Sequence, residues 1–356
     1  MTIIGHGTYG CIYKPPIKCA SSAKTRRKTI NYANKIAKLL TKNSANTEYD
    51  EYSIISKIDP KNKYHLGKPI LCEADAADLK EKTDAHPCDK YTEEKGNQDF
   101  RLLIMEYGGV ELKKYMEMPS AFTADFWKKA RNLFEGAQLF AKNGLTHRDI
   151  KPANILLNSK SNRIIYIDFG LSRNVKELTN DILDGTKKTS FHWSYPFEYG
   201  LVSQVKKIIK MTDPEADAFY KKTVKHVFND ISSNAHKNVK TMLVLLDDRM
   251  FPINDAKIES MTYDAIDSMR HFKSAEECVA TMAKTIDMFS LGLTMNMALN
   301  AFYDANKVTP AFYTQMRTLI ARMTSFNMKE RLQDYDEAIT LYDKIILKGS
   351  AKTRKQ

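Results

Sequence analysis

The sequence contains no long apolar run. None of its uncharged apolar stretches approaches the ~18 residues that a membrane-spanning helix needs, so we predict no membrane span. The first residues, Met1 to Gly5, also lack the basic and then apolar pattern of a secretion signal. We therefore expect a soluble, intracellular protein.

Cysteine is scarce. The chain has five cysteines, which are scattered at positions 11, 19, 72, 88 and 278. Because their number is odd and no secretion signal precedes them, we expect free thiols. Cys72, His86 and Cys88, with His65 nearby, match no compact zinc module, and the polar residues between Cys72 and Cys88 are typical of a loop. We expect no metal there.

Acidic residues are absent from the first 47 positions, which hold nine Lys or Arg residues, within a chain of net charge +12. Residues 73–99 lean acidic, and residues 348–356 form a basic tail. An acidic partner, a nucleic acid or an anionic surface would each suit the basic end. No basic stripe with interleaved aromatic residues and no zinc finger is present, so we expect no specific nucleic-acid binding.

The apolar pattern changes along the chain. Strands are predicted at 1–20 (two, around a glycine turn), 35–40, 100–107, 155–157 and 164–167, and helices at 48–58, 123–143, much of 199–300, and 309–347. The polar stretch 73–98 is predicted to be an exposed insertion. The fold class is therefore α+β, with a small β-rich part joined near Gly108 and Gly109 to a larger helical part.

A glycine-rich motif opens the chain. It comprises Gly5, His6, Gly7, Thr8, Tyr9 and Gly10, followed by Cys11 and Ile12. Glycines allow a hairpin to bring bare backbone N–H groups close to phosphates. Dinucleotide-binding folds use a similar pattern at the start of a helix, but here the chain continues as a strand.

Two longer motifs are more specific. His147-Arg-Asp-Ile-Lys-Pro-Ala-Asn154 fits H-R-D-L-x-x-x-N with one Leu-to-Ile change, and Asp168-Phe-Gly170 follows at the end of a strand. With the glycine motif, they make the sequence resemble the eukaryotic protein kinase family over nearly its whole length. The resemblance implies a two-lobed kinase fold, with an N-lobe at 1–107, a C-lobe at 108–347 and a basic tail at 348–356.

The resemblance also implies roles for these residues in transfer of the ATP γ-phosphate. Asp149 would be the catalytic base and Lys151 would reach the γ-phosphate, while Asn154 and Asp168 would bind Mg²⁺, or Mn²⁺ in its place. A lysine at position 151 is typical of serine/threonine kinases. The expected partners are ATP and protein substrates with Ser or Thr acceptors, and the expected state is a monomer.

The phosphate-binding lysine has two candidates. We favour Lys38 over Lys35 because Leu39 and Leu40 continue the strand after it. Its predicted partner is Glu51, since apolar residues follow Glu51 at helical spacing, whereas Glu48 is expected to be solvated. The hinge would comprise Met105, Glu106 and Gly108, and the adenine would lie against Ile12, Ile36 and Leu156.

Further landmarks lie in the C-lobe. Asp287 would fix the catalytic loop, and Glu198 would pair with Arg331. Between Glu198 and Asp287 the chain is far longer than the family needs, and we predict a helical insertion at about 203–283 ahead of the helix that carries Asp287. This insertion either selects substrates or is a passive elaboration. With the opening segment, it makes the chain resemble serine/threonine kinases of large double-stranded DNA viruses, which implies a location in host cytoplasm or virion.

Two other classes remain as alternatives, a pseudokinase scaffold and a small-molecule or lipid kinase. All motif residues are present, which argues against the first, and the Glu198–Arg331 pattern argues against the second. Arg148 would bind a phosphate on the activation segment, or else only the backbone. The four candidate phosphosites of that segment are Thr179, Thr186, Thr189 and Ser190. We favour Thr186 and Thr179, because the resemblance implies that Thr189 or Ser190 contacts Asp149 and Lys151 instead.

Overall fold

The computed structural model describes residues 2–7, 10–20, 30–158, 162–185, 192–229, 234–247, 249 and 254–352. The chain forms two compact units. The first comprises Met1–Gly109, Asn158–Lys160 and Ile167–Gly170, and the second comprises Val110–Leu157, Ser161–Tyr166 and Leu171–Gln356. Among the described residues, we find no helix with the length and apolar character that crossing a membrane demands.

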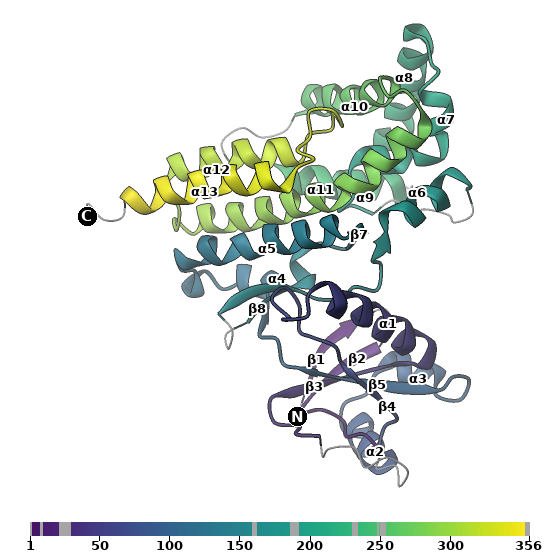
Figure 1. Ribbon diagram of the computed structural model, residues 1–356, viewed down its shortest axis with the longest axis vertical. Coiled ribbons are helices and arrows are strands. Elements are labelled where there is room, and N and C mark those ends of the chain that lie inside the picture. Colours follow the sequence, from purple (N-terminus) through teal and green to yellow (C-terminus); the bar gives the residue numbers. More distant parts are fainter. Residues whose placement is uncertain are drawn as a thin grey trace. The chain divides into compact units, whose positions relative to one another are not determined.

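An antiparallel sheet forms the centre of the first unit. Its strands are β1 (Thr2–Gly7), β2 (Gly10–Lys14), β3 (Lys35–Thr41), β4 (Ile70–Cys72) and β5 (Phe100–Glu106). In the described residues they are paired in the order β1-β2-β3-β5-β4 (Figure 1). The strands predicted at 1–20, 35–40 and 100–107 are confirmed.

Helix α1 (Lys42–Ile58) packs against this sheet. It begins six residues before the predicted start at position 48, because the Thr41 hydroxyl oxygen caps it by accepting a hydrogen bond from the Ser44 N–H at 3.4 Å. Its buried positions include Glu48, Glu51, Tyr52 and Ile55, the i, i+3, i+4 and i+7 spacing of one helix face. Both glutamates therefore lie on the buried face.

The segment at 73–98 is largely exposed, as predicted, but it is folded, so the expectation of a loop between Cys72 and Cys88 is wrong. It forms α2 (Ala76–Ala85) and α3 (Asp89–Glu94), and the Asp75 side chain caps α2 by accepting from the Asp78 N–H. Lys82 is 6% exposed, and its ammonium donates to the Pro16 carbonyl at 2.8 Å and to the Asp78 carboxylate. A buried lysine needs such partners, so these contacts fix α2 to the chain after β2.

Four of the five cysteines form disulfides, so the expectation of free thiols holds only for Cys278. Cys11 is bonded to Cys88, and Cys19 is bonded to Cys72. A β-bridge pairs Cys19 with Ala74, just after β4 ends at Cys72, and so places Cys19 beside the end of β4. Sequence spacing alone does not reveal this pairing.

The second unit is mainly helical, which, with the sheet of the first unit, confirms the predicted α+β fold class. Its strands are β6 (Val110–Glu111), β7 (Leu145–Thr146), β8 (Ile155–Asn158), β9 (Arg163–Tyr166) and β10 (Arg173–Asn174). Its first helices are α4 (Leu112–Met116), η1 (Pro119–Ala121), α5 (Asp125–Lys142), η2 (Pro152–Asn154), α6 (Val175–Leu183) and η3 (Phe197–Gln204). The remaining helices are α7 (Val205–Ile208), α8 (Asp213–Asn229), α9 (Asn234–Leu246), α10 (Asp255–Arg270), α11 (Ala275–Asp304), α12 (Pro310–Met323) and α13 (Tyr335–Lys352).

Helix α11 is buried along most of its length and contacts α5, α6, α9 and α12 (Figure 1). Most of its buried side chains, among them Phe289 and Phe302, are apolar, and burial of each large apolar side chain contributes about 1.5–3 kcal/mol. Helix α13 packs on α5 and α12, and α10 packs on α7 and α8.

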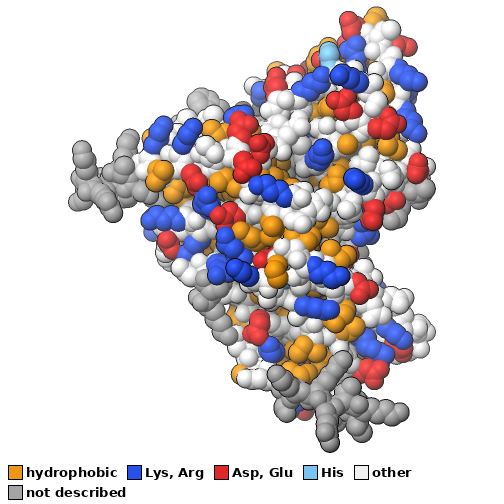
Figure 2. Space-filling model, in the orientation of Figure 1, with side chains coloured by type: hydrophobic (Ala, Val, Ile, Leu, Met, Phe, Trp, Pro, Cys, Tyr) orange, Lys and Arg blue, Asp and Glu red, His pale blue; other side chains and the backbone are white. Residues whose placement is uncertain are grey.

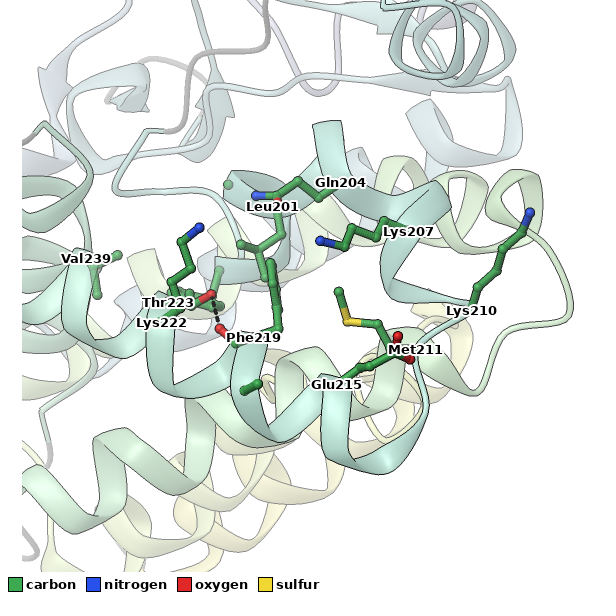
Figure 3. A pocket seen from close by; sticks show the side chains of 13 residues that line it. Leu201, Gln204, Lys207, Lys210, Met211, Glu215, Phe219, Lys222, Thr223 and Val239 are labelled. Atoms are coloured by element: carbon green, nitrogen blue, oxygen red, sulfur yellow. Dashed lines mark hydrogen bonds between the residues drawn. The ribbon is translucent and has the colours of Figure 1, made fainter.

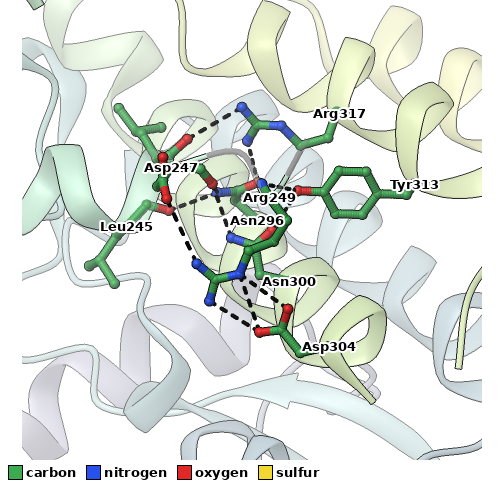
Figure 4. Close-up of polar contacts among 9 residues, drawn as sticks. Leu245, Asp247, Arg249, Asn296, Asn300, Asp304, Tyr313 and Arg317 are labelled. Carbon is green, nitrogen blue, oxygen red and sulfur yellow. Dashed lines mark hydrogen bonds and ion pairs between the residues drawn. The ribbon is translucent and has the colours of Figure 1, made fainter. Parts of the chain in front are cut away.

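The insertion predicted at about 203–283 is helical, as expected, and comprises α7 to α10 with the start of α11. Polar contacts fix the end of α9 to α11 (Figure 4). Asn296 and Asn300 donate to the Asp247 carbonyl at 3.2 and 3.1 Å, and the Arg249 guanidinium forms an ion pair with Asp304. These contacts pair buried amide groups that would otherwise cost stability.

Charges of both signs are interspersed on the face of the molecule shown in Figure 2. Within the basic N-terminal stretch, Lys35 is paired with Glu106 and Lys42 with Asp99. Part of the excess positive charge is thus neutralised by carboxylates from later in the chain.

Candidate active site

Lys38 is a partly buried lysine of the first unit, with 16% of its side chain exposed. It lies on β3, and its ammonium forms an ion pair of 2.6 Å with Glu48 on α1. The predicted pairing with Glu51 is therefore wrong, as is the expectation that Glu48 is solvated, since Glu48 is 8% exposed. Lys35, the alternative lysine, pairs with Glu106 at the end of β5.

The cluster around Lys38 has an excess of negative charge. Glu48, Glu51 and Asp168 all act electrostatically on this one ammonium. Burial alone would lower the pKa of Lys38, but Glu48, Asp168 and Glu51 outweigh burial and raise it above its ordinary value. Burial raises the pKa of Glu48; Lys38 opposes this effect, and Asp168 adds to it. The lysine is thus held in its charged form.

Asp168 has a left-handed backbone, with φ of 62°, which is uncommon for a residue with a side chain. The next residue, Phe169, is fully buried, and its ring meets those of Tyr52 and His65 edge-on at 5.6 and 6.2 Å between centroids. This aromatic packing holds the strained backbone in place. Asp168 is thereby positioned within the same unit as Lys38.

The predicted adenine-binding residues of the first unit lie on neighbouring strands. Ile36 is directly opposite Met105, and Ile12 is directly opposite Lys38. Ile36 and Met105 are 8% and 7% exposed. The Glu106 side chain is exposed. Gly108 comes two residues later in the chain, near the end of this unit. Leu156, the remaining predicted residue, is buried on β8 in the second unit.

The glycine motif forms the hairpin of β1 and β2, in which Gly5 pairs with Ile12 and Gly7 with Gly10. Thr8 and Tyr9, and the side chain of His6, lie outside the described residues. A Cβ at Gly10 would lie 1.9 Å from the Leu39 carbonyl oxygen on β3. Close packing of β2 on β3 therefore requires this glycine, whatever its relation to phosphates.

The second unit carries the catalytic-loop motif, and here the structure brings three predicted residues together. The Lys151 ammonium donates to Asp149 Oδ2 at 2.9 Å, and the Asn154 side-chain amide donates to the same oxygen at 2.7 Å. The Asn154 amide also donates to the Asp149 backbone carbonyl at 3.0 Å. With Asp149 only 8% exposed, its carboxylate is fixed in one orientation and its charge is compensated.

Asp287 fixes the backbone of this loop, as predicted. From α11, its carboxylate accepts hydrogen bonds from the His147 N–H at 2.6 Å and the Arg148 N–H at 2.8 Å. Arg148 has a left-handed backbone with φ of 65°. A buried carboxylate that binds two successive amides stabilises this strained turn just before Asp149.

The Arg148 guanidinium is directed to a tyrosine. It donates to the Tyr199 hydroxyl on η3 at 3.2 Å and to the Leu171 carbonyl at 3.4 Å. Of the four candidate phosphosites, Thr186, Thr189 and Ser190 lie outside the described residues. Thr179 lies in α6, and its hydroxyl donates to the Val175 carbonyl.

The predicted pair of Glu198 and Arg331 is confirmed. Two parallel hydrogen bonds, of 2.5 and 3.0 Å, join the guanidinium to the carboxylate, and both side chains are fully buried. Arg331 also donates to the Ser325 carbonyl and lies over the Phe289 ring. This pair ties the start of η3 to the last part of the chain.

Sequence reasoning missed three residues near these groups. Tyr52 packs on Phe169, and Tyr199 holds Arg148. His192 lies within the activation segment, which runs from Asp168 to Glu198; burial lowers its pKa, and Lys151 adds to the effect, while Asp149 opposes it. None of the three belongs to a short motif, so only the folded chain reveals them.

Asp168 in the first unit and Asn154 in the second unit each carry a side-chain oxygen of the kind that binds a hard cation. Both side chains offer oxygen, and the Asn154 nitrogen is already bonded to Asp149, which leaves its carbonyl oxygen. In the described part of the chain, no three acidic, histidine or cysteine side chains are grouped to hold an ion by themselves. Mg²⁺ commonly takes one or two protein oxygens together with substrate phosphates, so the residues fit that mode.

Comparison with known proteins gives the family. The model of the protein kinase domain matches residues 1–196, more than half of the chain. Serine/threonine-protein kinase ppk31 of Schizosaccharomyces pombe is 34% identical over 98 residues, which are 26% of this chain and 9% of that protein. Cell division control protein 2 homolog 3 of Trypanosoma brucei brucei is 29% identical over 175 residues, 49% of this chain and 46% of the relative. The chain thus spans less than half of either relative, but the match to the family model and the motif geometry agree. The chain belongs to the protein kinase domain family.

Proposed function

We propose that this kinase transfers the γ-phosphate of ATP to serine and threonine hydroxyls of protein substrates, with Asp149 as the catalytic base. The observation that carries the proposal is the Asp149 carboxylate, held by Lys151 and Asn154 at 2.9 and 2.7 Å. A fixed carboxylate can orient a hydroxyl and accept its proton as the oxygen attacks phosphorus. Lys151 beside it would stabilise negative charge on the transferred phosphoryl group.

The nucleotide would be bound by residues of the first unit. Lys38, kept charged by its three acidic neighbours, would donate to the α and β phosphates. Ile12, Ile36 and Leu156 would lie against the adenine, Met105 would be the gatekeeper side chain, and the backbone of Glu106 and Gly108 would hydrogen-bond the adenine edge. The backbone of the glycine hairpin would cover the phosphates.

Asn154 and Asp168 would hold Mg²⁺, for which Mn²⁺ is an acceptable substitute at oxygen donors. Bound with the nucleotide, the ion supplies neutralisation of the charge on the phosphate oxygens. The Asn154 amide that holds Asp149 would thus also link the metal site to the catalytic base.

Several finer expectations stay predictions. They are the resemblance to kinases of large double-stranded DNA viruses, a monomeric state, the absence of specific nucleic-acid binding, and a location in host cytoplasm or virion. The disulfides between Cys11 and Cys88 and between Cys19 and Cys72 do not support a reducing compartment.

The proposal is tested by incubating the full chain with labelled ATP, Mg²⁺ and a generic protein substrate, followed by phosphoamino-acid analysis. We expect label on serine and threonine, and a loss of about 10²–10⁴ in rate for Asp149→Asn. Lys38→Met and Asp168→Ala should lose activity similarly. Lys35→Met is the matched control and should retain activity. Full activity in all three variants would refute the proposal.

The ion pair of Lys38 with Glu48, in place of the predicted pair with Glu51, allows a sharper test of how the nucleotide is bound. Glu48→Gln should raise the KM for ATP, because it removes the carboxylate that positions the ammonium. Glu51→Gln lies one turn away on the same buried face and should have the smaller effect. A larger increase in the KM for ATP in Glu51→Gln than in Glu48→Gln would instead make Glu51 the functional partner of Lys38.

A further inference from the structure

The second unit contains a pocket of about 750 Å³ within the helical insertion. It lies among η3, α7 and α8, with one side chain from α9 (Figure 3). Its apolar surface comes from Phe197, Leu201, Met211, Phe219 and Val239. Both its size and its largely apolar lining fall in the range of ligand-binding sites.

Three lysines line this pocket, namely Lys207, Lys210 and Lys222, and all are exposed. None of the ion pairs among the described residues involves them, although the neighbouring Lys221 pairs with Asp217. Figure 3 shows Lys207 and Lys222 on either side of Phe219, while Lys210 points away. Two ammonium groups therefore flank an apolar surface.

Glu215 carries the single carboxylate among the described lining residues, and this carboxylate is already hydrogen-bonded within the protein. Glu215 accepts hydrogen bonds from both the backbone N–H and the hydroxyl of Thr212, at 2.8 Å each. The bond from the Thr212 N–H to Glu215 is one half of a capping box at the start of α8. Its pKa is lowered by these two bonds and, to a smaller extent, by Lys207. Three lysines against one glutamate leave an excess of two positive charges at the pocket.

The pocket is joined directly to the catalytic loop by η3. This helix supplies Phe197, Leu201 and Gln204 to the pocket, and its Tyr199 hydroxyl holds Arg148, next to Asp149. At about 2 Å of rise per residue in a 3₁₀-helix, Gln204 lies ~10 Å along η3 from Tyr199. An extended peptide covers that distance in about three residues.

We propose that this pocket binds an acidic segment of the protein substrate, with carboxylates at Lys207 and Lys222 and an apolar side chain against Phe219. The inference rests on the proposed kinase function and assigns its substrate class: Ser/Thr sites with glutamate or aspartate a few residues away. Charge complementarity selects the carboxylates, and the apolar lining selects the side chain between them.

The chemistry favours a carboxylate peptide over a nucleic acid. The lining residues include no arginine, whose planar fork suits phosphate, and Phe197 is already buried in a stack with Phe326. Single-stranded nucleic acids need successive aromatic platforms, whereas this pocket offers only Phe219 beside the lysines.

Binding is measured without catalysis, using the full chain with Asp149→Asn. The probe is a fluorescent peptide with glutamates on both sides of one leucine and alanine at the acceptor position. A matched peptide carries glutamine for each glutamate. We expect the glutamate peptide to bind about tenfold more tightly and to lose this advantage at high salt. In the background of Asp149→Asn, Lys207→Glu with Lys222→Glu should abolish the preference, and Lys210→Glu should retain it.

Equal binding of the two peptides would overturn the proposal. So would an equal loss in Lys210→Glu, which would reduce the effect to overall charge. A single-stranded oligonucleotide or a phosphoserine peptide that binds through Lys207 and Lys222 while the glutamate peptide does not would also overturn it.

Kinetics then separate the pocket from the kinase activity. With serine at the acceptor position, the double lysine variant should raise the KM of the glutamate peptide about tenfold and leave the KM for ATP and the turnover of the glutamine peptide unchanged. Absence of phosphorylation of either peptide by the wild-type chain would count against the kinase function, whereas the binding preference judges the pocket by itself.

Discussion

The buried pair of Glu198 and Arg331 offers the most direct test of how the second unit is held together. Arg331→Met removes a guanidinium that makes two hydrogen bonds to a carboxylate with no exposed surface. Glu198 then remains buried without its partner, which costs about 3–5 kcal/mol. Loss of the bond to the Ser325 carbonyl adds about 1 kcal/mol.

The loss of stability in Arg331→Met can be measured within the second unit alone. Both tryptophans of the chain, Trp127 and Trp193, lie in that unit, so their fluorescence reports its unfolding. At about 2–4 °C per kcal/mol for a unit of this size, a total loss of about 4–6 kcal/mol in Arg331→Met should lower the midpoint of thermal unfolding by roughly 8–24 °C.

A double variant supplies the control. Glu198→Met with Arg331→Met removes both charges and leaves apolar side chains among Phe289 and its neighbours, so it should cost less than Arg331→Met alone. If the double variant lost as much stability as the two single variants combined, the reasoning from an uncompensated buried charge would be refuted.

Two further predictions concern the first unit. Gly10→Ala places a Cβ 1.9 Å from the Leu39 carbonyl oxygen, so β2 must shift, and thermal unfolding should show a loss of about 1–3 kcal/mol; Gly96→Ala, with open space around it, should show almost none. His65 is 2% exposed and its Nδ1 accepts from the Gly67 N–H, so the fold favours neutral imidazole; burial lowers its pKa, although Asp59 opposes this effect. Because the folded pKa lies below the unfolded value of about 6.5, the free energy of unfolding should fall as pH drops through 6.5, by at most ~1.4 kcal/mol per pH unit. An unchanged pH dependence in His65→Asn would contradict this account.

The parts of the site that the sequence predicts are those with local geometry. Asp149, Lys151 and Asn154 lie within six residues, and one turn of chain brings their side chains together. The apolar residues next to Lys38 predict the strand that carries it. The insertion was predicted as helix for the same reason, since helical periodicity is visible within single segments.

The features of the site and fold that the sequence does not predict depend on which face of a helix is buried or on contacts between distant segments. Glu48 and Glu51 are three residues apart, and both lie on the buried face because α1 begins at its Thr41 cap. Which of them reaches Lys38 depends on how α1 packs on β3. The disulfides likewise depend on strand register, and the contact between Tyr199 and Arg148 joins residues 51 positions apart.

Helix α11 has a consequence for how this chain can vary in length. Within three turns it presents Thr285 to Arg331, Asp287 to the catalytic-loop amides, Ser290 to the Ser194 carbonyl and Asn296 to the end of α9. One added residue between Asp287 and Asn296 would rotate everything beyond it by about 100° and separate these attachments from one another. Related chains should therefore gain and lose residues in the segments between α7 and α10, while the spacing inside α11 stays constant.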